Sequence, residues 1–353
     1  MSLLRQFIRR RCLTTSDRRW PRCGFAHLSR EFEASVGKYA ANPALSVPQQ
    51  SLELSYEKLH EKVLFLASAL TSNGYGKESG ILIDLPNTAE NLILQLACSR
   101  VGVTVITTKD PTETLTNLLD ASNCGAAVTE SSELMGKIPV EKKRKMLPPV
   151  VVTEEDMSST ASKVESLSGT PIIFENATRE AAGRLPDILH DPSDVHAMFG
   201  AAKLTHESII DQGRSAKDYL AMEEADSVCV SITLCHAFGI ASAVSSTLMA
   251  GGTVVLPAVG GIRGCGNPNQ RAEVTLSVLK SEACTLLFAD SHTLKALPPP
   301  QPNDDLSKFR GGVVKIGSGA EFLEDVTSAD LGKGDVRELV YAGERLVAFG
   351  KRK

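Results

Sequence analysis

The sequence predicts an α/β fold of two stacked βα lobes with mostly parallel sheets. The chain has 353 residues, 42% apolar and 23% charged, which is about two structural units by length. Short apolar runs alternate with segments of helical periodicity, as in βαβ units. A stretch of different composition, residues 131–170, separates two such series. We therefore expect a first lobe over residues 23–190 and a second over residues 191–353.

The first series alternates three helices with three short strands. Ser55 is a suitable N-cap for its first helix, and glycine or proline follows most of the other segments. In chain order we expect a helix at 55–74, a strand at 81–85, a helix at 88–100, a strand at 103–107, a helix at 112–122 and a strand at 125–129.

The second series repeats the alternation after a stretch of loop and short strands. The expected strands are 227–234, 253–257, 284–289 and 313–317, and the expected helices are 238–250, 271–282 and one after Glu321. A proline-rich turn lies at 298–302, and we expect regular structure to end soon after Tyr341.

The first 22 residues differ from the rest in charge. They hold seven arginines and one aspartate, a charge of +6, so with a total of −4 the remainder carries −10. Apolar residues recur among the arginines at helical spacing, and hydroxyl residues follow. This pattern is typical of a mitochondrial presequence, although an ordinary basic N-terminus is the alternative. We expect a mitochondrial protein, in the matrix or on the matrix side of the inner membrane.

Several functional classes are excluded by composition. The negative net charge argues against nucleic-acid binding, and no apolar run approaches the ~18 residues of a membrane span. The eight cysteines are dilute and form no paired motif, so we expect them reduced. Residues 260–266 are interpreted as a plain glycine loop. No cofactor is expected. No metal site is expected either, because His190, His196 and His206 have no carboxylate or cysteine at ligand spacing.

One histidine stands at a position where a ligand would bind. His236 follows a predicted strand and precedes a helix, and open α/β sheets bind ligands at the carboxyl ends of their strands. A partly buried structural histidine is the alternative interpretation.

Taken in order, these segments resemble the adenylate-forming superfamily of acyl-CoA synthetases, luciferases and the adenylation domains of peptide synthetases. The most specific match is the segment 234–257, LCHAFGIASAVSSTLMAGGTVVLP, and the resemblance covers about residues 30–330. It implies the large domain of these enzymes, here without the barrel subdomain and the C-terminal lid. It also implies an old ligand pocket formed by His236, Phe238, Gly239, Gly317, Ser318, Gly319 and Ala320.

Two departures from the family pattern concern ATP. The place of the phosphate-binding loop holds only Phe199, Gly200, Ala201, Ala202 and Lys203. Such loops act through several backbone N–H groups and hydroxyls, which this segment cannot supply. The Tyr-Gly-x-Thr-Glu motif of the family is reduced to Tyr341 and Glu344, and no ribose-binding Asp or lid Lys follows. No residue is therefore assigned a catalytic role.

These departures predict a catalytically inactive acyl-CoA synthetase-like protein, an accessory or scaffold subunit of a mitochondrial complex. In the family, a barrel subdomain covers part of the second lobe. Here we expect the second lobe and residues 321–353 to bind other subunits through that surface. The alternatives are a binding module for an acyl, phosphopantetheine or nucleotide ligand, and a residual AMP-forming acyl-CoA ligase.

Overall fold

The computed structural model describes residues 27–108, 110–121, 123–153, 170–180, 183, 185, 191–199, 202–258, 267–315 and 339–349. Several predictions lie outside these residues: the basic segment 1–22, His190, the glycine loop 260–266, the glycine turn 317–320 and the helix after Glu321.

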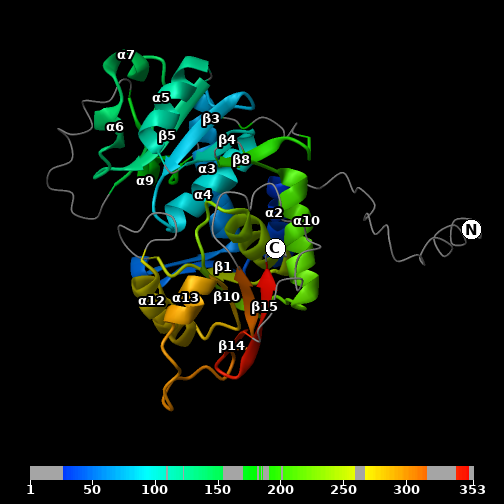
Figure 1. The fold of residues 1–353 in the computed structure, drawn as a ribbon. Coiled ribbons are helices and arrows are strands. Elements are labelled where there is room, and N and C mark those ends of the chain that lie inside the picture. Colours follow the sequence, from blue (N-terminus) through cyan, green and yellow to red (C-terminus); the bar gives the residue numbers. More distant parts are fainter. Residues whose placement is uncertain are drawn as a thin grey trace, which may run out of the picture.

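Two β-sheets form the framework of the described part (Figure 1). Sheet A has the order β14-β15-β13-β12-β10-β11-β1-β2, and sheet B has the order β7-β6-β5-β3-β4-β8-β9. The strands of sheet A are β1 (Pro43–Val47), β2 (Leu52–Ser55), β10 (Ser227–Ser231), β11 (Thr253–Val255), β12 (Leu286–Asp290), β13 (Gly312–Lys315), β14 (Leu339–Tyr341) and β15 (Glu344–Phe349). The strands of sheet B are β3 (Ser79–Asp84), β4 (Thr104–Thr107), β5 (Asn123–Thr129), β6 (Val150–Val152), β7 (Ile172–Ile173), β8 (Val195–Phe199) and β9 (Ala202–Thr205).

Most strand pairs in both sheets are parallel, which confirms the predicted fold class. The antiparallel pairs in the described residues are β1–β2, β14–β15 and β8–β9. The helices are α2 (Leu28–Tyr39), α3 (Tyr56–Ser72), α4 (Ala89–Val101), α5 (Pro111–Ala121), α6 (Leu134–Lys137), α7 (Val140–Lys143), α9 (Phe174–Ala177), α10 (His206–Tyr219), π-helix η3 (Phe238–Ser245), α11 (Ser246–Ala250), α12 (Pro268–Ser281) and α13 (Ser291–Ala296), with a short 3₁₀ turn at Pro48–Gln50.

The core lies mainly between the two sheets. Helices α3, α4 and α10 and the π-helix contribute apolar residues there, together with one face of each sheet. Alternate residues of β3 show the division: Ile81 and Ile83 belong to this central core, whereas Leu82 faces α5 and α6 on the outer side of sheet B. A smaller core lies between sheet A and α12. Both sheets are thus covered on both faces, as parallel sheets require.

The sheets exchange strands across the predicted boundary at residue 190. The β1–β2 hairpin belongs to sheet A, where Leu45 pairs with Val254 of β11 in parallel. The β8–β9 hairpin, in turn, extends sheet B through the β4–β8 pair. The two lobes are therefore interleaved in the sequence, because each sheet takes one hairpin from the other half of the chain.

The end of the described chain differs from the expectation. Strand β15 continues to Phe349, well past Tyr341, and pairs in parallel with β13. Ala342 and Gly343 connect β14 to β15 with φ values of 53° and 84°. Two such residues form the tight turn that fits a two-residue hairpin, and Leu346 of β15 is buried in the smaller core between sheet A and α12.

No helix in the described part of the chain is long and apolar enough to span a membrane.

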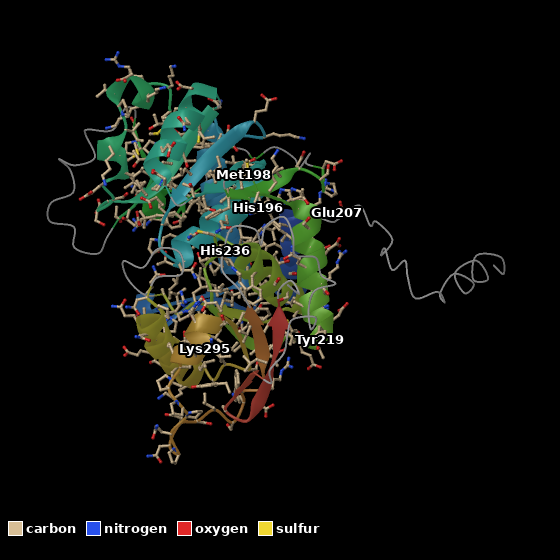
Figure 2. The ribbon with its side chains drawn as sticks, viewed as in Figure 1. His196, Met198, Glu207, Tyr219, His236 and Lys295 are labelled. Carbon is tan, nitrogen blue, oxygen red and sulfur yellow. The ribbon has the colours of Figure 1, made fainter. Side chains whose placement is uncertain are left out.

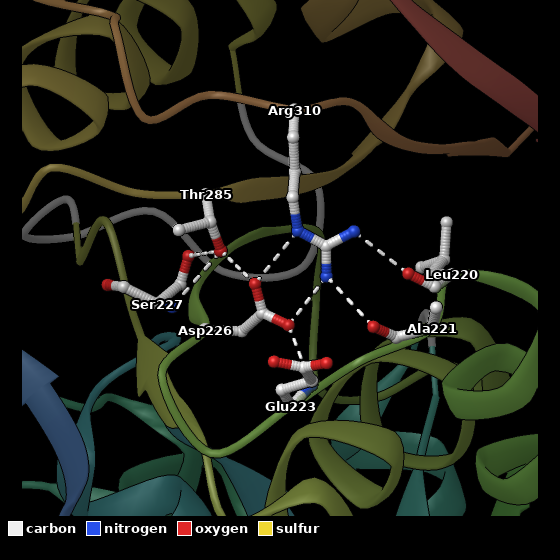
Figure 3. A network of polar contacts seen from close by, with 7 residues as sticks. All are labelled: Leu220, Ala221, Glu223, Asp226, Ser227, Thr285 and Arg310. Atoms are coloured by element: carbon white, nitrogen blue, oxygen red, sulfur yellow. Dashed lines mark hydrogen bonds and ion pairs between the residues drawn. The ribbon is translucent and has the colours of Figure 1, made fainter.

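A polar network joins the amino ends of three strands of sheet A (Figure 3). Asp226, just before β10, accepts hydrogen bonds from Arg310 Nε at 3.0 Å and Nη2 at 2.6 Å and from Thr285 Oγ1 at 2.6 Å. Thr285 precedes β12 and Arg310 precedes β13. Arg310 Nη1 also donates to the carbonyl of Leu220 at 2.8 Å. The Asp226 side chain is almost fully buried, so its charge depends on these partners.

Replacing Asp226 by alanine is expected to lower the free energy of unfolding by about 3 kcal/mol, because Arg310, Thr285 and the backbone N–H of Glu223 lose a buried acceptor. Urea denaturation measures the change. Asp218→Ala, on the exposed surface of α10, is the matched control and should change the free energy by less than about 0.5 kcal/mol. Equal stabilities of the two variants would contradict the role of the network.

Candidate functional site

The loop that carries His236 follows strand β10 at the carboxyl edge of sheet A. Residues of the other lobe hold this loop in place. Asn87 donates to the carbonyl of Ile232 at 2.9 Å and accepts from the backbone N–H of Leu234 at 2.8 Å. Gln95 of α4 donates to the carbonyl of Leu234 at 3.2 Å. Figure 2 accordingly shows His236 near the middle of the molecule, where the two lobes meet.

Two further residues of the predicted pocket have structural roles. A Cβ atom on Gly239 would lie 2.1 Å from the carbonyl oxygen of Thr233, so only glycine fits beside the loop. Phe238 is fully buried and packs on Phe288 of β12, with ring centroids 5.6 Å apart. It belongs to the central core. Both residues open the π-helix, an irregular form that is frequent at functional sites.

The ring of His236 packs against Phe199, with centroids 5.8 Å apart and the planes inclined by 25°. Its Nδ1 atom is buried and has no hydrogen-bond partner among the described residues. Burial, with a smaller contribution from the nearby Lys315, lowers the pKa of His236 to about 4, while Asp290 opposes both effects. The imidazole is therefore neutral at physiological pH, with one ring nitrogen able to bond to a ligand.

The segment in the place of the phosphate loop includes the end of β8 and the start of β9. Phe199 of β8 pairs with Ala202 of β9, and Met198 pairs with Lys203, whereas Gly200 and Ala201 lie outside the described part. Ala202 is buried and Lys203 is exposed. The hairpin thereby brings Phe199, the first residue of the predicted segment, onto His236.

Tyr341 and Glu344 lie at the opposite edge of sheet A. They pair across the β14–β15 turn, and because β15 runs parallel to β13, this turn is at the amino ends of the strands. Tyr341 donates to the carbonyl of Pro298 at 3.1 Å, and Glu344 is exposed. The structure therefore does not bring either residue to His236.

A buried charged group at the carboxyl ends of β12 and β13 was missed by the sequence analysis. Arg271 of α12 donates from Nη2 to Asp290 Oδ2 at 2.7 Å and from Nε to Thr293 Oγ1 at 2.6 Å. The N–H of Thr293 donates to Asp290 Oδ1 at 2.7 Å. Lys315, the residue that pairs with Asp290 in β13, is only 2% exposed. Charged residues directly after apolar runs, in LLFAD and GVVK, were the available signal.

Two of the histidines that the sequence analysis considered as metal ligands lie together in the core. His206 stacks on His27 with ring centroids 3.7 Å apart, and His196 lies 5.1 Å from His206. Among the described residues, no group of three or more His, Cys, Asp or Glu side chains is arranged to hold a metal ion. Burial lowers the pKa of His196 to about 4, so it is a neutral core residue.

Comparison with known proteins shows which family and which proteins this chain resembles. Residues 32–192 match the family described as AMP-binding enzyme. The mitochondrial medium-chain acyl-CoA ligase ACSF2 of Bos taurus is 22% identical over 345 residues, which are 89% of this chain and 54% of that protein. An oxalate-CoA ligase of Arabidopsis thaliana is 26% identical over 239 residues, 66% of this chain and 45% of that protein. The chain thus spans about half the length of these relatives.

Solved structures share the fold. The anthranilate CoA ligase AuaEII in complex with anthranoyl-AMP has a TM-score of 0.66 at 15% identity, over 83% of this chain and 55% of that one. A luciferase-like enzyme from the mealworm Zophobas morio has a TM-score of 0.62 at 19% identity, over 85% of this chain and 68% of that one.

These findings overturn the prediction that the protein is not an enzyme. The relatives matched over most of the chain are named ligases, and the similar structures include further CoA ligases. The short segment 199–203 and the altered motif at Tyr341 and Glu344 differ from the family in sequence. These differences do not by themselves demonstrate a loss of activity.

The histidine core predicts a pH-dependent stability. Unfolded His196 binds a proton near pH 6.5, whereas the folded residue does so only near pH 4, so stability is complete above about pH 6.5 and falls toward pH 4. Between pH 7.5 and 5 the wild type should lose about 2 kcal/mol more unfolding free energy than His196→Leu does. Urea denaturation at both pH values measures the difference. Equal losses in the two proteins would show that His196 does not titrate in this way.

Proposed function

Because residues 32–192 match the AMP-binding enzyme family, we propose that the protein is an acyl-CoA ligase-like protein that binds a carboxylic acid, or the acyl adenylate made from it, beside His236. The observation that carries this proposal is the buried, unpartnered Nδ1 of His236 at the carboxyl edge of sheet A. Ligands of open α/β sheets bind at this edge. One similar structure holds anthranoyl-AMP, which supports an acyl adenylate as ligand.

The neutral imidazole suits an acyl ligand. It offers one hydrogen bond to a carboxylate or carbonyl oxygen without adding a charge to the buried site. Phe199 covers one face of the ring and supplies apolar surface for an acyl chain. In AMP-forming chemistry a carboxylate oxygen attacks the α-phosphorus of ATP, the bond to pyrophosphate breaks, and an acyl adenylate results. In this proposal, His236 and Phe199 form the acyl side of such a site.

The test is a comparison of carboxylate binding by wild-type protein and His236→Ala. Calorimetry with pentanoate, octanoate and a non-hydrolysable acyl-adenylate analogue should show binding that is about tenfold weaker in the variant, the loss expected for one buried hydrogen bond. Pyrophosphate release from Mg-ATP with the same acids tests turnover.

His292→Ala is the matched control, because His292 is an exposed histidine on helix α13. Its affinity should equal that of the wild type. A wild type that binds none of these compounds, or a His236 variant with unchanged affinity, would overturn the proposed site.

We also propose that the protein works in mitochondria as part of a protein assembly. The +6 segment over residues 1–22 and the mitochondrial relative support this location. The described surface adds no support for a partner site, since its large exposed apolar side chains are Val140 on α7 and Tyr219 on α10. The assembly therefore rests on the sequence alone.

A fusion of residues 1–30 to a fluorescent protein is expected to enter mitochondria, because the segment has the composition of a presequence. Native-gel fractionation of the full chain should then place it in a band far larger than 37.7 kDa. A cytosolic fusion would contradict the location, and a monomeric band would contradict the assembly.

A further inference from the structure

Arg271 is a buried arginine with donors left over. Its Nε and Nη2 atoms bond to Thr293 and Asp290, and the side chain is 8% exposed. The Nη1 atom is also buried, yet it has no hydrogen-bond partner among the described residues. Buried guanidinium donors are normally satisfied, so this atom marks a position where an acceptor is missing.

The geometry of the unused donors selects the chemistry of that acceptor. The edge formed by Nε and Nη2 is occupied by Thr293 and Asp290. The free edge consists of Nη1 with both of its hydrogens and the second hydrogen of Nη2. Two adjacent parallel N–H groups fit the two oxygens of a carboxylate or a phosphate in a bidentate pair. The two oxygens of Asp290 accept from Nη2 and from the N–H of Thr293, and neither accepts a hydrogen bond from Nη1.

Arg271 is linked to the site of the proposed function through Asp290. Asp290 bonds directly to Arg271 and also acts electrostatically on His236. Lys315 acts on His236 as well, and it is the residue paired with Asp290 in the adjacent parallel strand, so the two side chains leave the same face of sheet A. Asp290 is therefore the common neighbour of His236, Arg271 and Lys315.

We propose that Arg271 binds a second oxyanion of the ligand, so that the acid taken beside His236 carries an anionic group at its far end. The ligand is then a dicarboxylic acid, or an acyl compound with a phosphate in the same place. This inference rests on the proposed function, because it names the substrate class of that site. His236 bonds to the acyl end, Arg271 holds the distal oxyanion, and Asp290 orients the guanidinium.

The experiment compares two acids of equal length. Glutarate carries a second carboxylate that pentanoate lacks, and inorganic phosphate probes the oxyanion site alone. Calorimetry on the full chain should show glutarate binding at least tenfold tighter than pentanoate. In the double variant Arg271→Gln/Asp290→Asn this preference should fall to within twofold. The double variant removes both charges, so that neither is left uncompensated in the core.

Two further variants keep the result interpretable if the double variant does not fold. Asp290→Asn keeps the guanidinium but removes the carboxylate that orients it, so glutarate should bind several-fold more weakly while pentanoate is unchanged. Lys295→Gln removes an exposed positive charge from α13 and should leave the preference as in the wild type (Figure 2). Circular dichroism and thermal unfolding establish that each variant is folded.

The outcomes separate this inference from the proposed function. If phosphate binds in an Arg271-dependent manner and glutarate does not, the oxyanion site stands and its source is a phosphate. If pentanoate binds in a His236-dependent manner but neither glutarate nor phosphate depends on Arg271, the proposed function stands and the second oxyanion site is wrong. A glutarate preference that the folded double variant retains in full would also overturn it.

Discussion

The ion pair between Asp226 and Arg310 fixes the amino ends of β10, β12 and β13 relative to one another (Figure 3). These three strands are parallel neighbours, so a fixed amino edge also fixes where their carboxyl ends stand. The loop with His236, the carboxylate of Asp290 and the ammonium of Lys315 all follow from those ends. The placement of the candidate site thus depends on a polar network at the far edge of the same sheet, which contacts none of the site residues.

A second constraint couples the site to the other lobe. Asn87 and Gln95 supply hydrogen bonds to the backbone of the loop that follows β10, and Phe199 of sheet B packs on the imidazole. Tyr56 at the start of α3 adds a further link, because its hydroxyl donates to the carbonyl of Gly252 at 2.8 Å. His236 is consequently held by both sheets, and a displacement of either lobe would alter its surroundings.

Local pattern was sufficient for most elements but not for their long-range pairing. The helices at 55–74, 88–100, 112–122 and 271–282 were found within a few residues, because apolar periodicity and N-caps such as Ser55 are local signals. The exchange of hairpins between the sheets depends on contacts far apart in the sequence, which periodicity does not encode. His236 was predicted as a site residue from its position after a strand, and the structure places it after β10. Arg271 and Asp290 were missed, since a salt bridge between a helix and a strand end has no fixed spacing. Tyr341 and Glu344 were placed by motif likeness, whereas the hairpin geometry puts them at the opposite edge.

The pairing of β1 with β11 has a consequence for how the chain folds as it is made. Thr253 bonds to Pro43 across a separation of 210 residues. At synthesis rates of about 5–20 residues per second, that interval lasts roughly 10–40 s. During this time the β1–β2 hairpin has no sheet to join, and an isolated two-stranded hairpin is marginally stable in water. Its exposed edge is then open to unwanted strand pairing. The nascent chain therefore carries an unpaired strand edge at residues 43–55 until the segment 253–255 has emerged.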